Sequence, residues 1–271
     1  PLRKRQKNVA KEGLGKWFKE DWVDIKTGKP CGRSGKKDKR GYPACRPKKV
    51  AKKMTAAEKK TMSKKKTSSA RKKWSVREAA EGDLLTFIKL VAPHILYGAV
   101  HEELVSWWGR QGAKENQLVL LPRGHMKSKL AAYRTAWWIT KHPETTVLYV
   151  SATADLAEKQ LYAIKQIIDS PIYRRYWADM IHPEEGKREK WAVAEIAVDH
   201  PQRKLEGIRD ATCKAVGLTS NTTGFHADIV VLDDIVVPGN AYSEEGREKV
   251  GNAYSQLASI ENPGAQEWVV G

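Results

Sequence analysis

The sequence predicts an α/β protein with a mostly parallel sheet and helices on both faces. Short apolar runs alternate with helical segments along residues 74–271, the pattern of strand–helix–strand units. The run at residues 229–232 is apolar at every position, as expected of a strand that is buried on both faces. A basic, largely irregular segment precedes this domain, since the first quarter of the chain holds most of its positive charge.

The positive charge of the protein is confined to its N-terminal quarter. Residues 1–73 contain 27 Lys and Arg against 6 Asp and Glu, a net charge of +21, while residues 74–271 contain 22 against 26, a net charge of −4. Such a basic block indicates an anionic polymer as partner, nucleic acid first. The alternative interpretation is a solubilising or disordered tail.

Three segments follow from this composition. Residues 1–47 form a small basic module that contains tryptophan and cysteine, residues 48–73 form a Lys-rich linker or frayed helix, and residues 74–271 form the α/β domain. Within the module, residues 22–29 could form a short hairpin.

The three cysteines, Cys31, Cys45 and Cys213, do not predict a disulfide framework, so a reducing, intracellular setting fits best. Cys31 and Cys45 supply only half of a zinc site. The sequence contains no stretch of about 18 apolar residues, and we therefore expect no membrane span.

The elements of the α/β domain are predicted from apolar periodicity. Ser75 is the expected N-cap of the first helix, which Pro93 ends. We expect helices over residues 75–92, 100–110, 127–140, 154–169 and 243–259, and strands over residues 117–121, 146–150, 213–217, 229–232 and 267–270.

Residues 121–128 have the setting of a phosphate-binding loop, between an apolar strand and a helix. Such a loop wraps polyphosphate with backbone N–H groups, while a Lys reaches the β- and γ-phosphates and a Ser or Thr binds Mg²⁺. Lys127 and Ser128 fill those last two positions, although Leu121 and Met126 replace the two usual glycines. The predicted nucleotide-binding residues are Pro122, Arg123, Gly124, His125, Met126, Lys127 and Ser128.

A second motif, Asp233 followed by Asp234, ends the apolar run at residues 229–232. Two carboxylates at the end of a buried strand are costly unless a cation lies near them. The alternative is that they cap the next turn. With the loop upstream, they predict a P-loop NTPase that binds ATP and Mg²⁺, with Ser128 and Asp233 as the metal ligands.

Residues 120–128 resemble the large terminase subunit of tailed bacteriophages, which often carries Pro-Arg-Gly-His before its Lys-Ser or Lys-Thr. Three further stretches are similar to that family: residues 101–108, in a helix that contributes to adenine-side binding there, residues 147–158, and residues 217–234. Together the resemblance covers roughly residues 84–271.

The resemblance implies an ATPase that drives double-stranded DNA into a procapsid. It implies a homo-oligomeric ring that acts with the portal and the small terminase subunit in the host cytoplasm, as a virus-encoded protein that is not a stable virion component. In this comparison Lys127 binds the β- and γ-phosphates, and Asp234 takes the place of the catalytic carboxylate. Arg123 contacts phosphate within its own subunit or across the ring.

The chain departs from the family in several places. The family usually has Glu where Asp234 stands, and Met126 restricts the backbone of the loop. The coupling motif and the RNase H-like nuclease domain of the family are not found in the sequence, so we expect a truncated C-terminus and assign no cleavage activity. Candidates for an arginine finger are Arg174, Arg175 and Arg209.

Two other interpretations stay open. The first is another P-loop nucleic-acid motor, such as a helicase, because helicases share the Ser-Ala-Thr motif at residues 151–153. The second is a basic DNA-binding protein with a degenerate nucleotide fold.

Overall fold

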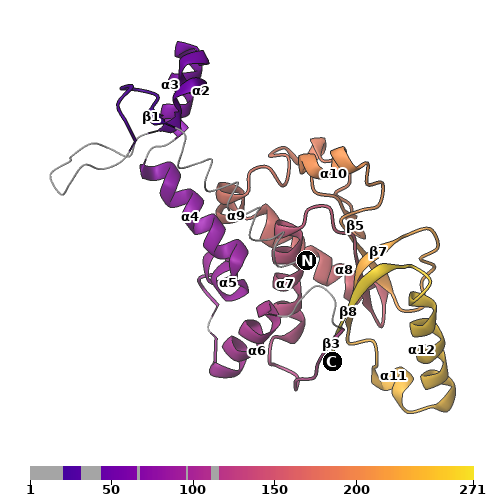
Figure 1. Cartoon of the computed structure of the whole chain (residues 1–271). Helices are drawn as coiled ribbons and strands as arrows, with labels where there is room; N and C mark the ends of the chain where they lie inside the picture. Colours follow the sequence, from indigo (N-terminus) through magenta and orange to yellow (C-terminus); the bar gives the residue numbers. More distant parts are fainter. Residues whose placement is uncertain (1–20, 32–43, 66–67, 96, 111–115) are drawn as a thin grey trace, which may run out of the picture. The chain divides into compact units, whose positions relative to one another are not determined.

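The computed structural model describes residues 21–31, 44–65, 68–95, 97–110 and 116–271 (Figure 1). Contacts between Cα atoms divide the chain into two units, residues 1–75 and residues 76–271.

The second unit is built on a six-stranded sheet of strand order β3-β8-β7-β4-β6-β5 (Figure 1). All neighbouring strands pair in parallel except β5 and β6. The predicted mostly parallel α/β sheet is therefore confirmed. The strands are β3 (Gln117–Val119), β4 (Val147–Ser151), β5 (Glu195–Ile196), β6 (Cys213–Gly217), β7 (Ala227–Asp233) and β8 (Glu261–Val270).

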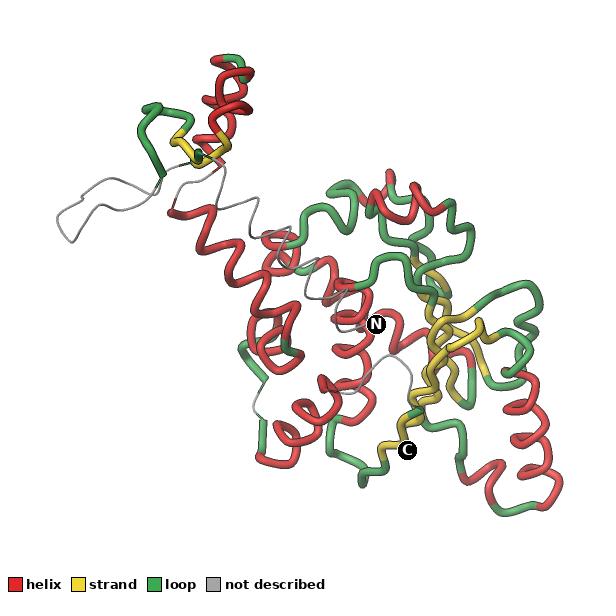
Figure 2. The backbone as a smooth tube through the Cα atoms, viewed as in Figure 1, coloured by secondary structure: helices red, strands yellow, loops and turns green. Residues whose placement is uncertain are grey.

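The central strands send alternate side chains into two separate apolar cores, one on each face of the sheet. In β4, Val147 and Tyr149 join the larger core, whereas Leu148 and Val150 join the smaller one. Because side chains alternate along a strand, a strand between two helical layers must be apolar throughout. Helices therefore cover both faces (Figure 2), as predicted.

Most helices of this unit pack in the larger core: α5 (Leu84–Val91), α6 (Ala99–Arg110), α7 (Lys127–Lys141), α8 (Ala154–Asp169) and α9 (Pro171–Tyr176). The smaller core is covered by α12 (Glu244–Leu257) through Ala253 and Leu257. Short helices η1 (Glu185–Lys187), α10 (Pro201–Glu206) and α11 (Pro238–Ala241) complete the connections.

Two predicted elements differ from the structure by more than two residues at one end. The single helix expected over residues 75–92 is two helices, α4 (Ser68–Gly82) and α5, because Asp83 leaves the helical conformation and caps α5. Its carboxylate accepts hydrogen bonds from Thr86 N and Thr86 Oγ1, at 2.8 and 2.6 Å. Strand β8 begins at Glu261, not at residue 267, and its first half contains Pro263 and Gly264, which obscure a strand pattern.

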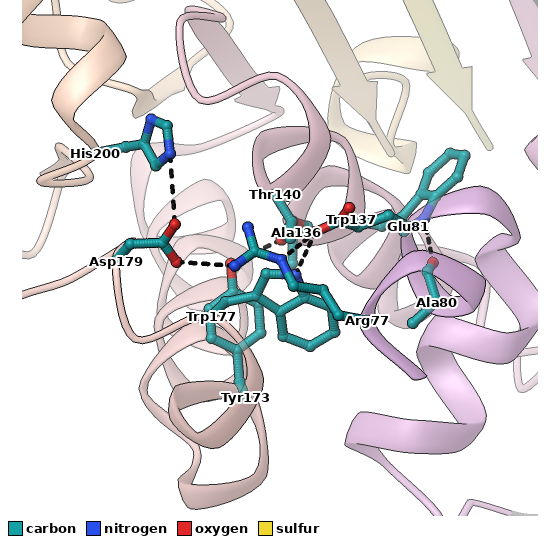
Figure 3. A network of polar contacts seen from close by, with 10 residues as sticks. All are labelled: Arg77, Ala80, Glu81, Ala136, Trp137, Thr140, Tyr173, Trp177, Asp179 and His200. Carbon is teal, nitrogen blue, oxygen red and sulfur yellow. Dashed lines mark hydrogen bonds and ion pairs between the residues drawn. The ribbon is translucent and has the colours of Figure 1, made fainter. Parts of the chain in front are cut away.

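A polar network fixes the end of α4 against the domain (Figure 3). Arg77 pairs with Glu81 at 2.6 Å and with Asp179 at 3.3 Å. Trp177 Nε1 donates to Glu81 at 2.8 Å, and His200 lies 3.6 Å from Asp179. These contacts join the end of α4 to the segment that follows α9. Most of the charged side chains in the network are paired with an opposite charge.

Buried polar groups in the same region are also satisfied (Figure 3). Trp137 Nε1 donates to the carbonyl of Ala80 at 2.9 Å, and the hydroxyls of Thr140 and Tyr173 lie 2.7 Å apart. Since an unpaired buried polar group costs free energy, these hydrogen bonds help residues 130–140 of α7 to lie inside the larger core.

The described part of the N-terminal unit is ordered around a small sheet. Strands β1 (Trp22–Asp24) and β2 (Cys45–Pro47) pair antiparallel, and helices α2 (Lys48–Lys53) and α3 (Ala56–Lys65) follow. The hairpin expected over residues 22–29 is only partly found: the chain turns back there, with a single bridge between Val23 and Pro30, but the strand partner of β1 is β2. Of the two interpretations of this segment, linker or frayed helix, the structure has helices at residues 48–53 and 56–65, because Lys and Ala are strong helix formers.

Cys31 and Cys45 form a disulfide, so the expectations of half a zinc site and of no disulfide were wrong. The β1–β2 register brings the two cysteines together, and spacing alone does not reveal that register. The bond compensates for a core of only Val23, Ile25, Ala44 and Ala51. Cys213 is a free, buried thiol.

None of the described helices combines the length and apolar character that a bilayer span requires.

We predict that the double substitution Cys31→Ser, Cys45→Ser destabilises the N-terminal unit. A closed loop of about 15 residues contributes on the order of 3 kcal/mol. Hydrogen exchange of the full chain, followed by mass spectrometry, should show lost protection in residues 21–31 and 44–54 and unchanged protection in β4 and β7. Unaltered exchange at residues 21–31 would contradict this stabilising role.

Candidate nucleotide-binding site

The two strands that lead into the predicted motifs, β3 and β7, end at the same level of the sheet, because both pair with β8, which lies between them. Val270 of β8 is the register partner of both Val119 in β3 and Asp233 in β7. Beyond the strands, Leu121 N donates to Gly271 O, and Asp234 N donates to Val270 O, both at 2.9 Å. The carboxyl end of β8 thus holds both motifs side by side, at the edge where parallel sheets bind ligands.

The loop between β3 and α7 turns through two left-handed residues. Gly124 has φ 85°, and Met126 has φ 54° and ψ 19°. Met126 is the N-cap of α7, and its carbonyl accepts the first helical hydrogen bond, from Leu130 N at 2.8 Å. Met126 was expected to restrict the loop. It instead adopts the conformation that glycine would take most easily.

Backbone strain is concentrated at this site. Within the described residues, Met126 and Asp234 are the only non-glycine residues with positive φ, at 54° and 49°. A left-handed non-glycine residue costs roughly 1–2 kcal/mol, although Asp tolerates it better than Met. Such strain gathers at ligand-binding positions, and both motifs carry it here.

Side chains of the two motifs meet in pairs. Ser128 Oγ donates to Asp233 Oδ1 at 2.8 Å, and Lys127 Nζ lies 3.0 Å from Asp234 Oδ1. The structure therefore brings together four predicted residues that are about a hundred positions apart in the sequence. Asp234 is about half exposed, whereas the Lys127 side chain is 12% exposed, so the carboxylate of this pair faces solvent.

Asp233 is a buried carboxylate, only 3% exposed. Burial raises its pKa above the ordinary value, and hydrogen bonds from Ser128 and Tyr149 oppose that rise. Tyr149 OH donates to Asp233 Oδ2 at 3.0 Å. Both carboxylate oxygens thus accept a hydrogen bond, which holds Asp233 in one orientation beside Ser128.

Tyr149 was missed by the sequence analysis. It is fully buried in β4, where the flanking positions are apolar, and its hydroxyl needs a partner there. That requirement was the available signal: a Tyr inside a buried strand must face a polar group on an adjacent element.

The other loop residues lie closer to solvent. Arg123 is exposed, and the ring nitrogen Nδ1 of His125 lies 3.3 Å from the Arg123 carbonyl. The ring of His101, near the start of α6, lies 6.2 Å from the His125 ring. His101 Nε2 is buried and has no hydrogen-bond partner among the described residues. The start of α6 therefore adjoins the loop with an unused polar atom.

Arg134 in α7 is a buried cation between two indole rings. Its guanidinium lies 3.7 Å from the ring centroid of Trp268 in β8 and 4.9 Å from that of Trp108 in α6. Its nitrogens have no hydrogen-bond partner among the described residues, and burial lowers its pKa to about 8. Cation–π attraction favours the charged form against that burial. The stack joins α7, which begins at Lys127, to the strand between the motifs.

The candidates for an arginine finger lie elsewhere. Arg174, in α9, pairs with Asp169 at 3.6 Å, and Arg175 lies 5.9 Å from the ring of Tyr176. Arg209 lines a cavity of about 480 Å³ beside Thr146 and Asp228, at the amino ends of β4 and β7. This is the opposite edge of the sheet from Lys127, so Arg209 cannot serve the loop of its own subunit.

The donor set fits a magnesium ion that arrives with a nucleotide. No group of three or more His, Cys, Asp or Glu side chains gathers as a metal site in the described part of the chain. Ser128 and Asp233 supply two oxygen ligands. Mg²⁺ prefers oxygen and commonly binds through one or two carboxylates together with phosphate oxygens and water.

Comparison with known proteins points to one family. No protein family model matches the sequence. Over 141 residues the chain is 27% identical to the large terminase subunit of Enterobacteria phage T3, an alignment that covers 52% of this chain and 22% of the phage protein. About half of the chain is thus homologous to a phage terminase large subunit. The alignment spans less than a quarter of that relative's length.

Among solved structures, the chain is similar to the large terminase ATPase domain of Thermus phage P74-26. The two are 17% identical with a TM-score of 0.34, over 68% of this chain and 67% of that one.

We predict that Asp233→Asn stabilises the nucleotide-free protein at neutral pH. The raised pKa of Asp233 means that stability is lost as pH rises through the folded-state value, where the buried group ionises. Removing the charge should raise Tm by about 2–4 °C, the shift that ~1 kcal/mol produces in a domain of this size. The gain should disappear at acidic pH, where Asp233 is protonated.

Asp234→Asn is the matched control, because Asp234 is half exposed and should show no such gain. Calorimetry between pH 4 and pH 8 measures both variants. A Tm for Asp233→Asn that lies below the parent across this whole range would contradict the prediction.

We predict that Met126→Gly is more stable than Met126→Ala. Both remove the packing of the Met side chain against the larger core, so their difference isolates the backbone. Glycine adopts positive φ without a steric cost, and its advantage should be about 1 kcal/mol. Chemical denaturation measures the difference. Equal stability would show that Met126 does not hold a left-handed conformation.

Proposed function

We propose that this chain is the ATP-binding and ATP-hydrolysing motor part of a viral terminase large subunit, which drives double-stranded DNA into a procapsid. One observation carries the proposal: Lys127 and Ser128 meet Asp234 and Asp233 at the carboxyl edge of a parallel sheet. The homology over half of the chain supports the choice of terminase among P-loop motors.

The proposed roles follow from position and charge. Backbone N–H groups of residues 122–128 would surround the phosphates at the start of α7, and Lys127 Nζ would bind their β- and γ-oxygens. Phosphate would then compete with Asp234 for Lys127, which lies 3.0 Å from that carboxylate. Asp234 would thereby become free to orient the attacking water. Arg123, exposed in the loop, would contact phosphate from its own subunit or from a neighbour in a ring.

Ser128 and Asp233 would hold Mg²⁺, which when bound neutralises charge on the phosphate oxygens. Tyr149 holds the carboxylate that would face the ion, through its 3.0 Å hydrogen bond to Asp233. His101, whose Nε2 is buried without a partner among the described residues, is placed to contact the nucleotide from α6.

The wider setting also belongs to this proposal. The motor would act in the host cytoplasm as a homo-oligomeric ring, on double-stranded DNA, with the portal and the small terminase subunit. Its three parts would be the basic module of residues 1–47, the Lys-rich segment of residues 48–73 and the ATPase domain of residues 74–271. Cleavage of DNA is not assigned to this chain.

We predict that Lys127→Ala abolishes ATP hydrolysis and weakens binding of Mg²⁺ and a fluorescent ATP analogue by more than about tenfold, the effect of losing ~1.4 kcal/mol. Lys129→Ala is the control, because Lys129 is exposed in the first turn of the same helix. Binding and turnover are measured separately, so that a chain that binds ATP without hydrolysing it still tests the site.

Equal affinity and turnover in the Lys127→Ala variant and the parent would refute the site. Salt-dependent DNA binding by a parent protein that has no affinity for Mg²⁺ and ATP would instead favour a DNA-binding protein with a degenerate nucleotide fold.

A further inference from the structure

Helix α2 in the N-terminal unit is a short helix whose charge is entirely positive. Its six residues include Lys48, Lys49, Lys52 and Lys53, and no acidic residue. All four lysines are exposed. None of them forms an ion pair within the described residues.

This arrangement costs stability in the isolated protein. Lys48 and Lys52 are four residues apart, as are Lys49 and Lys53, and like charges at that spacing on a helix repel each other by about 0.2–0.5 kcal/mol per pair. An anion bound along α2 would remove this repulsion.

Two acidic residues of this unit are engaged in local hydrogen bonds. Asp24 accepts hydrogen bonds from Lys26 N at 3.1 Å and from Thr27 Oγ1 at 2.8 Å, within its own turn. Glu58 accepts from Thr55 N at 2.8 Å, at the start of α3. Asp21, whose carbonyl accepts from Lys48 N at 2.7 Å, lies beside α2 as well. None of these three acids forms an ion pair with a lysine of α2 within the described residues, which leaves the charge of α2 open to an external partner.

The unit presents α2 as a fixed surface. Ala51 packs with Val23, Ile25 and Ala44 in the small core, and the Cys31–Cys45 disulfide closes the sheet from which α2 continues. The lysines therefore project from a folded element, and binding would not require the backbone of residues 48–53 to become ordered first.

We propose that α2 binds the phosphate backbone of double-stranded DNA without sequence preference, at a site separate from the ATP site. Over the roughly 9 Å length of a six-residue helix, a duplex carries about five charges, close in number to the four lysines. Lysine binds phosphate as a point charge without a fixed bidentate geometry, which suits contacts to a backbone that carry no sequence preference. The choice of DNA among anionic polymers rests on the proposed function.

The test uses the full chain with Lys48, Lys49, Lys52 and Lys53 all changed to Gln. Binding to a fluorescent 30-base-pair duplex is followed by anisotropy between 50 and 200 mM NaCl. Affinity that depends on phosphate contacts falls steeply over this range of salt. Loss of four phosphate contacts should reduce the slope of log K against log salt by about 3.6, at ~0.9 per contact. Changing the same four residues to Arg should preserve the slope.

The matched control changes Lys159, Lys187, Lys204 and Lys249 to Gln, since these residues are exposed in the second unit. It removes the same total charge. An equal loss of slope in this control would assign DNA binding to net charge and overturn the proposal, as would an unchanged slope in the α2 variant.

Hydrogen exchange at residues 21–31 verifies that the unit remains folded in the α2 variant. If that protection is lost, single Lys→Gln variants should each lower the slope by about 0.9, and unchanged slopes in all four would overturn the proposal.

Competition identifies the partner class. Unlabelled duplex should displace the labelled duplex at lower concentration than polyglutamate or single-stranded RNA of equal charge. Equal displacement by polyglutamate would indicate an acidic protein as partner and refute the DNA site. Affinity for the ATP analogue should be the same in the α2 variant and the parent. DNA binding through α2 by a chain without nucleotide affinity would leave this inference standing while the proposed function fails.

Discussion

The position of β8 between β3 and β7 is the constraint on which the candidate site depends. Val270 is level with both Val119 and Asp233, so the loop and the acidic strand end meet although neither strand touches the other. Parallel pairing gives the two motifs the same direction, and hydrogen bonds from Leu121 and Asp234 to the end of β8 fix their separation. The Ser128–Asp233 hydrogen bond is a consequence of this arrangement.

The two acidic residues of the site differ in how deeply they are buried. Asp233 is enclosed, carries a raised pKa and is held by Ser128 and Tyr149, which suits a fixed ligand for a cation. Asp234 is half exposed and left-handed, and within the described residues its ion pair is with Lys127. In the proposed function this suits a group that would change partner on phosphate binding. The strained backbone at Met126 and Asp234 is tolerated because the strands and α7 fix both ends of the site.

The helical layer connects this edge to the rest of the domain through aromatic side chains. Arg134 lies between Trp108 and Trp268, so α6, α7 and β8 share one buried cation. Any shift of α7 relative to β8 would disturb that stack, since a buried charge without hydrogen bonds depends on the ring faces. The N-terminal unit is stabilised differently, by a disulfide and four small or branched apolar residues.

The sequence by itself determined the class of sheet, the positions of most elements and the two motifs. These depend on local periodicity and on the rule that ligands bind at strand carboxyl ends: α8 and β6 have the predicted bounds, and Lys127 begins its helix. Only the tertiary structure decided the place of β8, the Tyr149 contact with Asp233, the Arg134 stack and the pairing of Cys31 with Cys45. Each of these depends on strand order or register between distant segments, which local patterns in a single chain do not encode.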